Sequence, residues 1–298
     1  MFRKVLNVKT MDDTAIVKFD KNMVAITSDS VIENVHFVRN SNPLMIGKYA
    51  VNVNLSDLAA AGSVPTALMI SVGIPAATKN SYIKSMVMGM KMALEPYSIE
   101  VIGGDTKESE TLFISITAYG TSPNRDLFLK REGIKQGDLV AITGNLGKAG
   151  RNHYLWKKTG YVKYMNDMLS ITPRIKEGIK LNKYGLATAC MDLSDGLTES
   201  LELLSSTNHV GFNILKSDIA IDVGAIKLSE KDQIPIEEFF DYGGDYELLF
   251  TTKKDRLNKL LEILDFTIIG EATEDKTIYY ITEHGLEHAV DHGFKHFR

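Results

Sequence analysis

The sequence contains a single cysteine, Cys190, among its 298 residues, and it has no uninterrupted apolar run of membrane-spanning length. One cysteine excludes an intramolecular disulfide and a cysteine-rich zinc site, and a transmembrane helix needs about 20 apolar residues. The opening residues, MFRKVLNVKTMDD, also lack the apolar segment that follows the basic residues of a signal peptide. We therefore expect a cytoplasmic protein in a reducing compartment, with no membrane partner.

The chain also lacks a strong excess of charge of either sign. The formal net charge is −4 at pH 7, from 34 basic and 38 acidic side chains. A nucleic-acid-binding surface requires a concentration of Lys and Arg, so the composition indicates no nucleic-acid partner. Hydrophobic residues (44%) and charged residues (24%) occur in the proportions of an ordinary globular protein. The length favours two domains.

The chain does contain a succession of strand-like and helix-like segments. The segments expected to form strands are 14–19, 23–28, 31–38, 66–74, 100–106, 111–120, 138–144, 185–194, 246–252 and 266–272. Helices are expected at 43–62, where alternation in VNVNL is a competing strand signal, and at 80–95, after 172–173, at 196–206 and at 254–264. Strands and helices do not strictly alternate, which favours α+β layers over a doubly wound parallel sheet.

A polar, glycine-bearing stretch from Gly133 to Asp138 marks the expected domain boundary, between residues 1–134 and 135–298. In the expected helix 80–95, the apolar residues Ile83, Val87, Met90 and Leu94 recur at helical spacing and are expected to face the core.

Aspartates recur at expected strand ends and tight turns along the whole chain. They are Asp12, Asp13, Asp29, Asp57, Asp105, Asp192 and Asp195. Taken singly, each has an ordinary explanation, such as a turn or, for Asp195, a helix N-cap. If several converge, their charges repel and must be neutralised by protons or cations. Oxygen ligands with little histidine favour a hard ion, magnesium first, and magnesium commonly shares its shell with the phosphates of a nucleotide.

Donors for phosphate are less distinctive. The glycine turns VIGGDT and ITGNLGKAG offer backbone N–H groups to an anion. Neither turn matches the GxxxxGK[ST] or GxGxxG pattern. Arg131 is a candidate phosphate clamp, although an isolated arginine is more often an exposed surface residue.

Several motifs together resemble the thiamine-monophosphate kinase family of the aminoimidazole ribonucleotide synthetase (PurM-like) superfamily. DDTAIV, SDSVIENVHF, VNVNLSDLAAAG, VIGGDT, MDLSDGL and GGDYELLF occur in the family's order and approximate spacing, and the resemblance runs from Asp12 to the closing GFKHF. It implies a two-domain PurM-like α+β fold, with an N-terminal α/β domain that binds ATP and Mg²⁺ and dimerises. It also implies a homodimeric kinase of thiamine biosynthesis that converts thiamine monophosphate to thiamine diphosphate.

The resemblance also implies residue roles. The implied metal ligands, for several Mg²⁺ ions, are Asp13, Thr27, Ser28, Asp29, Asp57, Asp105, Asp192 and Asp195. The implied ATP contacts are Gly104, Asp105, Arg131 and Ser194, and the implied contacts to the thiamine phosphate are His36 and Phe294. No covalent or acid–base group is implied, because metal-assisted in-line transfer needs none. From the residues alone, His36 beside Phe37 is more simply a satisfied core side chain.

Two positions depart from the family pattern. Gly244 stands where the family carries a glutamate that contacts the substrate, so this substrate-binding position lacks its carboxylate, and Asp241 is a nearby substitute. Met11 stands where the family has glycine. The alternatives are therefore another PurM-like ATP-dependent enzyme, such as an aminoimidazole ribonucleotide synthetase, or a non-catalytic ATP-binding paralogue. Relatives that use a cysteine near one terminus fit less well, because Cys190 lies well inside the chain.

Overall fold

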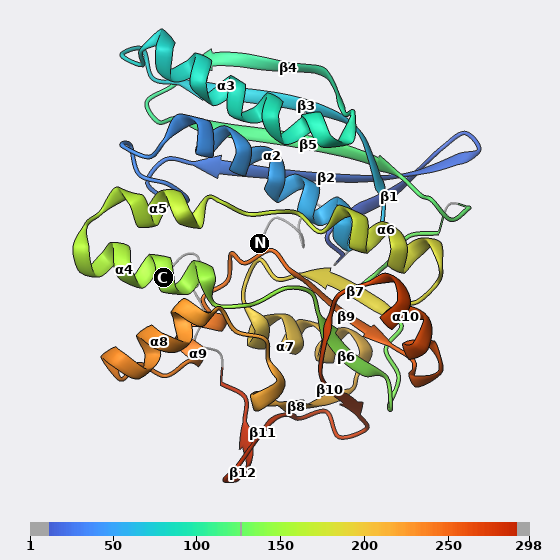
Figure 1. Cartoon of the computed structure of the whole chain (residues 1–298). Helices are drawn as coiled ribbons and strands as arrows, with labels where there is room; N and C mark the ends of the chain where they lie inside the picture. The colour runs from blue at the N-terminus through green and yellow to red at the C-terminus, as the bar shows by residue number, and fades with distance from the viewer. Residues whose placement is uncertain (1–11, 126, 291–298) are drawn as a thin grey trace.

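Two mixed β-sheets, one above the other in Figure 1, organise the protein, whose computed structural model describes residues 12–125 and 127–290. The upper sheet has the order β1-β2-β5-β3-β4. Its strands are β1 (Ala15–Phe19), β2 (Asn22–Ile32), β3 (Val64–Ile74), β4 (Glu100–Glu108) and β5 (Phe113–Thr121). The helices α2 (Pro43–Ala60) and α3 (Asn80–Leu94) cover one face of this sheet (Figure 1).

The lower sheet is built from the second half of the chain, in the order β12-β11-β8-β10-β6-β9-β7. Its strands are β6 (Leu139–Ile142), β7 (Ala189–Asp192), β8 (Gly211–Leu215), β9 (Leu248–Thr252), β10 (Thr267–Thr273), β11 (Ile278–Thr282) and β12 (Gly285–His288). The helices around it are α4 (Lys148–Thr159), α5 (Val162–Met168), α6 (Ile175–Lys183), α7 (Leu197–Asn208), α8 (Val223–Asp232), α9 (Glu237–Phe240) and α10 (Leu257–Ile263).

Both sheets mix strand directions, which confirms the α+β class. In the described residues, β3–β4 pair in parallel within an otherwise antiparallel upper sheet. The pair β8–β11 is parallel within the lower one. The upper sheet ends at Thr121 and the lower begins at Leu139. The exact domain boundary near Gly133 stays a prediction.

Helix α2 confirms the expected helix at 43–62 and occupies the centre of the molecule. Asn42 caps it by accepting a hydrogen bond from the Leu44 N–H at 3.0 Å, and Pro43 supplies the fixed φ of a first helical turn. The helix contacts α3 and the strands β2 and β5 on some sides, and α6 and β7 on others. A helix buried on most sides shows no single apolar stripe, which explains the misleading alternation in VNVNL.

The two halves share a core at α2. One apolar cluster joins residues such as Leu55 and Leu58 of α2 to Leu181 of α6 and Phe250 of β9. Gly178 lets α6 approach closely, because a Cβ there would lie 2.0 Å from the Ala59 carbonyl oxygen. The groups that α2 presents to the lower half are therefore held at fixed positions.

Some expectations are wrong in detail. Residues 31–38 do not form a third strand, because β2 runs on to Ile32 and the chain then turns. The imidazole Nδ1 of His36 accepts a hydrogen bond from the Ile32 N–H at 3.1 Å and holds this turn. In α3, Val87 is 53% exposed and does not face the core, whereas Met90 and Leu94 are buried. Among the described residues, no helix is both long and apolar enough to span a bilayer.

Candidate active site

Three aspartates from distant parts of the chain meet where the two halves adjoin. Asp13 precedes β1, Asp57 lies in the last turns of α2, and Asp192 ends β7. Each offers a carboxylate oxygen, and the three oxygens lie within 4.8 Å of one another. The structure therefore brings together three of the predicted metal ligands.

Hydrogen bonds from neighbouring side chains hold each carboxylate of this acidic cluster. The Thr27 hydroxyl donates to Asp57, and the buried Ser56 hydroxyl donates to Asp192 Oδ2 at 2.5 Å. The Arg131 guanidinium forms an ion pair with Asp13. The Arg131 side chain is only 14% exposed. It is therefore an ion-pair partner of the cluster and not the exposed surface residue that an isolated arginine more often is.

Burial and mutual repulsion raise the pKa values of the cluster. Burial, only partly offset by the Arg131 charge and hydrogen bond, raises the pKa of Asp13 to about 6. Burial and then the Asp13 charge raise the pKa of Asp192 to about 8. Burial, followed by the charges of Asp192, Asp29 and Asp13, raises the pKa of Asp57 well above its usual value. The ionised cluster thus lacks enough positive charge of its own.

The acidic cluster fits a hard divalent cation. Its donors are carboxylate oxygens, the ligands that Mg²⁺ prefers. Asp192 is 1% exposed, and its Oδ1 atom has no hydrogen-bond partner among the described residues. A buried carboxylate oxygen without a partner is costly, and a bound cation would satisfy it.

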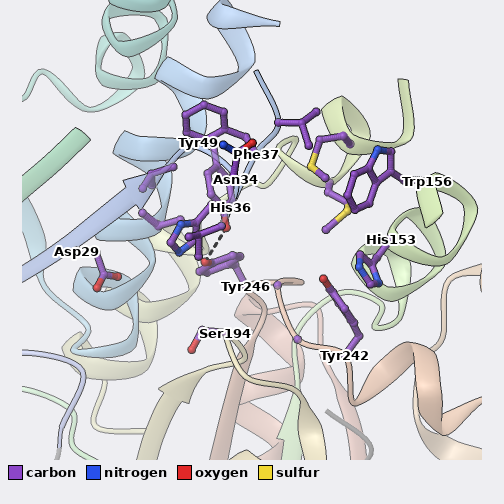
Figure 2. A pocket seen from close by; sticks show the side chains of 18 of the residues that line it. Asp29, Asn34, His36, Phe37, Tyr49, His153, Trp156, Ser194, Tyr242 and Tyr246 are labelled. Atoms are coloured by element: carbon purple, nitrogen blue, oxygen red, sulfur yellow. Dashed lines mark hydrogen bonds between the residues drawn. The ribbon is translucent and has the colours of Figure 1, made fainter. Parts of the chain in front are cut away.

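A cavity of about 610 Å³ opens beside the cluster. Asp29, Ser194 and Asp195 line it, and Figure 2 shows Asp29 and Ser194 at one end. The buried Asn54 of α2 fixes this end, because its Oδ1 atom accepts a hydrogen bond from the Asp29 N–H at 3.0 Å. Desolvation by the surrounding cavity residues, and then the Asp195 charge, raise the pKa of Asp29. The Asp29 side chain is still accessible to solvent.

The opposite end of the cavity is aromatic. His153 and Trp156 come from α4 and Tyr242 from the loop after α9, and all three line the cavity (Figure 2). The rings of His153 and Tyr242 stack with centroids 4.4 Å apart at 23°, and Trp156 lies 5.9 Å from His153. Burial and the Lys157 charge lower the pKa of His153 to about 4, so this imidazole is neutral at physiological pH.

Two tyrosines and His36 line the middle of the cavity. The hydroxyls of Tyr49 on α2 and Tyr246 after α9 are 3.0 Å apart and hydrogen-bonded, so they link the two halves (Figure 2). His36 lines the same cavity while the neighbouring Phe37 is buried in the core. Because His36 Nδ1 accepts the Ile32 N–H, the ring proton is assigned to Nε2.

The loop that carries Gly244 is interlocked with the MDLSDG loop. The Gly244 N–H donates to the Ser194 carbonyl at 2.8 Å, and a Cβ on Gly243 would lie 2.4 Å from the same oxygen. Asp195 does not cap α7, whose N-cap position is Gly196. Asp241 takes that part by accepting hydrogen bonds from the Thr198 N–H and hydroxyl. Asp241 is 1% exposed and is not among the cavity residues, so the structure argues against it as a substitute for the missing glutamate.

A smaller cavity of about 250 Å³ adjoins the first, and both are lined by Gly244 and Met168. Its charged lining includes Arg174, which forms an ion pair with Glu247. Asp245 also faces it and accepts hydrogen bonds from the Gly147 and Ala149 N–H groups, at 2.6 and 2.9 Å. Asp245 therefore caps α4 from a distant loop and fixes the helix that carries His153 and Trp156.

Other predicted site residues are not brought to the cluster. Ser28 points to the other face of β2, where its hydroxyl lies 3.1 Å from that of Thr117. Gly104 and Asp105 lie on the exposed edge strand β4. In register, Asp29 pairs with Ile116, Ile116 with Ile70, and Ile70 with Gly104, so three strand spacings, roughly 14 Å, separate Asp29 from this part of β4. Met11 and Phe294 lie outside the described residues.

Sequence reasoning missed the aromatic end and most of its supports. His153 and Trp156 stand at i and i+3, the spacing of neighbours on one helix face, but no helix is predicted for their segment, which follows the glycine loop NLGKAG. Tyr242 lies outside the recognised motifs, and Tyr246 lies in GGDYELLF, which does not reveal its contact with Tyr49. Asn54 was available to sequence reasoning, because it shares the α2 face of Asp57.

Comparison with known proteins places this site among related ones. The family model described as AIR synthase related protein, N-terminal domain, matches residues 11–122. The thiamine-monophosphate kinase of Aquifex aeolicus is 34% identical over 287 residues, covering 94% of this chain and 91% of that protein. The thiamine-monophosphate kinase of Buchnera aphidicola subsp. Acyrthosiphon pisum is 34% identical over 275 residues, covering 88% of this chain and 83% of that protein.

A solved structure agrees with these relatives. AaThiL complexed with AMPPCP and TMP matches with a TM-score of 0.83 at 33% identity, over 94% of this chain and 90% of that chain. The likeness therefore extends over both sheets and the cavity between them, and it confirms the PurM-like fold.

Proposed function

Because the chain belongs to the thiamine-monophosphate kinase family, we propose that it transfers the γ-phosphoryl group of ATP to thiamine monophosphate and forms thiamine diphosphate. Support comes from the related structure that holds AMPPCP and TMP together. The observation that carries the proposal is the acidic cluster of Asp13, Asp57 and Asp192 beside a 610 Å³ cavity with an aromatic end.

The reaction joins two anions, and the residues of this chain suit that task. A phosphate oxygen of the acceptor attacks the γ-phosphorus, the bond to the β–γ bridging oxygen breaks, and ADP leaves with that electron pair. The acceptor phosphate is largely ionised at neutral pH, since its second pKa is near 6, so no general base is required. The barrier is then dominated by charge repulsion and alignment.

We assign the cation-holding role to the acidic cluster, with Asp29, Asp195 and Thr27 beside it. When bound, Mg²⁺ would neutralise charge on the transferring phosphoryl group. Arg131 keeps Asp13 in place through its ion pair, and Asn54 holds the backbone of Asp29. We assign Ser194 to the nucleotide and His36 to the acceptor phosphate, because both side chains line the cavity.

An acceptor panel tests the proposal. ADP release is measured with thiamine monophosphate, with unphosphorylated thiamine, with formylglycinamidine ribonucleotide, and with no acceptor, and the product is identified by mass. We expect Mg²⁺-dependent ADP release only with thiamine monophosphate, with equal amounts of thiamine diphosphate. ATP binding without acceptor-dependent turnover would instead identify a non-catalytic paralogue, and turnover only with formylglycinamidine ribonucleotide would identify an aminoimidazole ribonucleotide synthetase.

We further propose that the protein is a homodimer that buries an apolar groove of about 570 Å³ between α3 and strands β3 and β4. Val87, Val101 and Ile102 are each about half exposed beside it, and β4 is exposed along its whole length in the single chain. An exposed apolar edge strand is a site for pairing with another chain. Val101→Asp should yield monomers in sedimentation velocity, whereas Val223→Asp, at an exposed valine of α8, should not.

Such a dimer also gives Asp105 a place in the site. Within one chain Asp105 stands about three strands from Asp29, too far to share a cation. We propose that Gly104 and Asp105 act at the nucleotide site of the second subunit.

A subunit-mixing experiment tests this arrangement. The variants Asp29→Asn and Asp105→Asn are each expected to be inactive on their own. An equal mixture of the two variants should regain roughly a quarter of wild-type activity. Half of the dimers in the mixture carry one subunit of each variant, and one of the two sites in such a dimer keeps both aspartates. No recovery after subunit exchange, shown by mixed-tag pull-down, would place Asp105 and Asp29 in one chain's site.

We also propose a cytoplasmic location. Cys190 is a buried free thiol, and the described residues contain no membrane-spanning helix. Cell fractionation with a tagged chain tests this, and recovery in the membrane or secreted fraction would contradict it.

A further inference from the structure

The two ends of the 610 Å³ cavity differ in charge and in shape. Asp29 and Ser194 lie at the end beside the acidic cluster, and Trp156, His153 and Tyr242 lie at the other end (Figure 2). Asp195, which also lines the cavity, directly follows Ser194 in the chain. A ligand that fills the cavity must therefore place its anionic group, with a cation, at one end and an apolar or aromatic group at the other.

The aromatic end has the geometry of a shelf for a planar ring. His153 and Tyr242 stack at 4.4 Å with an angle of 23° between their planes, and Trp156 is tilted by 42° to His153. Each of the three side chains is half-buried rather than covered by the core. Met165 and Met168 of α5 also line the cavity, and thioethers pack well against aromatic edges.

The charge at this end favours a neutral ring over a cationic one. The Lys157 ammonium lies 5.1 Å from the Trp156 ring centroid and lines the cavity. His153 carries no charge at physiological pH, for the reasons given above. A second cation placed here would be repelled by Lys157. Asp29 and Ser194 lie at the opposite end in Figure 2, and Asp195, the other carboxylate among the described lining residues, directly follows Ser194.

Thiamine monophosphate has two rings of different charge. Its thiazolium ring is cationic and carries the phosphorylated arm, and its aminopyrimidine ring is neutral. We propose that Trp156, with His153 and Tyr242, forms a shelf that binds the neutral aminopyrimidine ring and makes Trp156 a specificity-determining residue. The thiazolium ring then lies toward Asp195 and Asp29, where its charge is compensated. This inference rests on the proposed function and adds which residues select the acceptor.

A fragment of the acceptor tests the shelf directly. Phosphorylated hydroxyethylthiazole keeps the phosphate and the five-membered ring but lacks the aminopyrimidine. Dissociation constants for both compounds are measured by calorimetry with Mg²⁺ and AMPPCP. Wild type should bind thiamine monophosphate about tenfold more tightly than the fragment, the scale of one aromatic contact. Trp156→Leu should reduce this ratio to about threefold or less, with the affinity for the fragment unchanged.

Matched variants separate the shelf from general damage. Tyr242→Leu should reduce the ratio as Trp156→Leu does, because it removes the stacking partner of His153. Tyr161→Leu, at an aromatic residue that is 67% exposed between α4 and α5 and does not line the cavity, should leave it unchanged. An unchanged ratio in both shelf variants would overturn the proposal, as would equal losses for the acceptor and the fragment.

The chain provides its own optical signal, because Trp156 is its only tryptophan. Thiamine monophosphate should quench the Trp156 fluorescence in wild type and in Tyr161→Leu, and the fragment should quench it much less. Equal quenching by both compounds would overturn the proposed orientation.

These readouts are independent of turnover. If wild type binds thiamine monophosphate on the shelf but releases no ADP, the kinase proposal fails and the shelf stands. If wild type turns over and Trp156→Leu keeps the full acceptor preference, the shelf fails and the kinase proposal stands.

Discussion

The acidic and aromatic ends of one cavity are built on opposite physical principles. In the acidic cluster beside the acidic end, Asp13, Asp57 and Asp192 come from three separate parts of the chain, and each is held by a partner side chain. At the aromatic end, His153 and Trp156 share one helix and meet Tyr242 through ring contacts. The first end brings together groups that repel one another, and the second brings together groups that attract.

This difference separates stability from function. A cluster of buried like charges costs folding free energy until a cation neutralises it, so these residues destabilise the unliganded fold. Stacked aromatic side chains contribute favourable packing before any ligand binds. Removing an acid should therefore raise the stability of the metal-free protein while abolishing activity. Removing an aromatic side chain should change stability and activity only modestly.

The largest effect is expected from Asp57→Asn. Loss of one cation-holding carboxylate should lower turnover roughly a thousandfold, a scale typical of removing transition-state electrostatics. Asparagine still accepts the Thr27 hydrogen bond, so the Mg²⁺-free variant should be more stable than wild type by about 1 kcal/mol. ADP release and urea unfolding at pH 8 measure the two effects. Asp20→Asn, in the exposed β1–β2 turn, is the control, and near-normal turnover of Asp57→Asn would refute the metal assignment.

Arg131→Met should show the opposite sign on stability. It leaves the Asp13 carboxylate buried without its counter-ion, and the Mg²⁺-free protein should lose about 3 kcal/mol at pH 8. The double variant with Asp13→Asn should recover part of this loss, because the stranded charge is removed. Equal losses in the single and double variants would show that packing around Arg131, rather than its charge, stabilises this end.

Magnesium should stabilise the protein more at pH 8 than at pH 6. The folded-state pKa values of Asp13 and Asp192 are raised to about 6 and about 8, above the usual value of 3.8, so the folded chain holds protons that the unfolded chain has released. Raising the pH through this window therefore lowers the stability of the metal-free protein. Bound Mg²⁺ takes the place of those protons, and saturation at 100 times the dissociation constant adds about 2.7 kcal/mol.

Melting temperatures with and without millimolar Mg²⁺ at the two pH values measure this difference. Asp57→Asn should show a smaller Mg²⁺ effect at both. An equal Mg²⁺ effect at pH 6 and pH 8 in wild type would show that the acids do not compete with protons for the ion.

The acidic cluster could be predicted from the sequence because its members stand in short, recognisable motifs. Asp57 and Asp192 occur in NLSDLAAAG and MDLSDGL, and the structure brings both to one point. Asp105 occurs in an equally clear pattern, VIGGDT, yet it lies three strands away from Asp29. A sequence motif identifies a candidate metal ligand. The order of the strands in the sheet and the assembly of subunits decide which candidates lie close together.

The aromatic end could not be predicted because its position depends on contacts between distant segments. Helix α4 carries many polar residues and begins after a glycine loop, and its N-terminal cap is Asp245, about 98 positions away in the chain. The sequence analysis predicts only the glycine loop NLGKAG at its start and no helix after it. Only the packed structure brings His153 and Tyr242 into contact.

The smallest effect is expected at Gly244, one of the residues that line both cavities. Its φ is +80°, so Gly244→Ala should cost about 1 kcal/mol of backbone strain. The new Cβ would lie an ordinary 3.4 Å from the Ala149 side chain and clash with nothing. Gly196→Ala is the matched comparison, because its φ of +94° is similar but its Cβ would lie 2.2 Å from the Asp241 carbonyl oxygen. Chemical denaturation should therefore rank Gly196→Ala well below Gly244→Ala, with the acceptor affinity of Gly244→Ala within about threefold of wild type. Equal losses of stability in the two variants would show that the space around Gly244 is tighter than its geometry indicates. The absence of the family's glutamate at this position would then leave no room for a side chain.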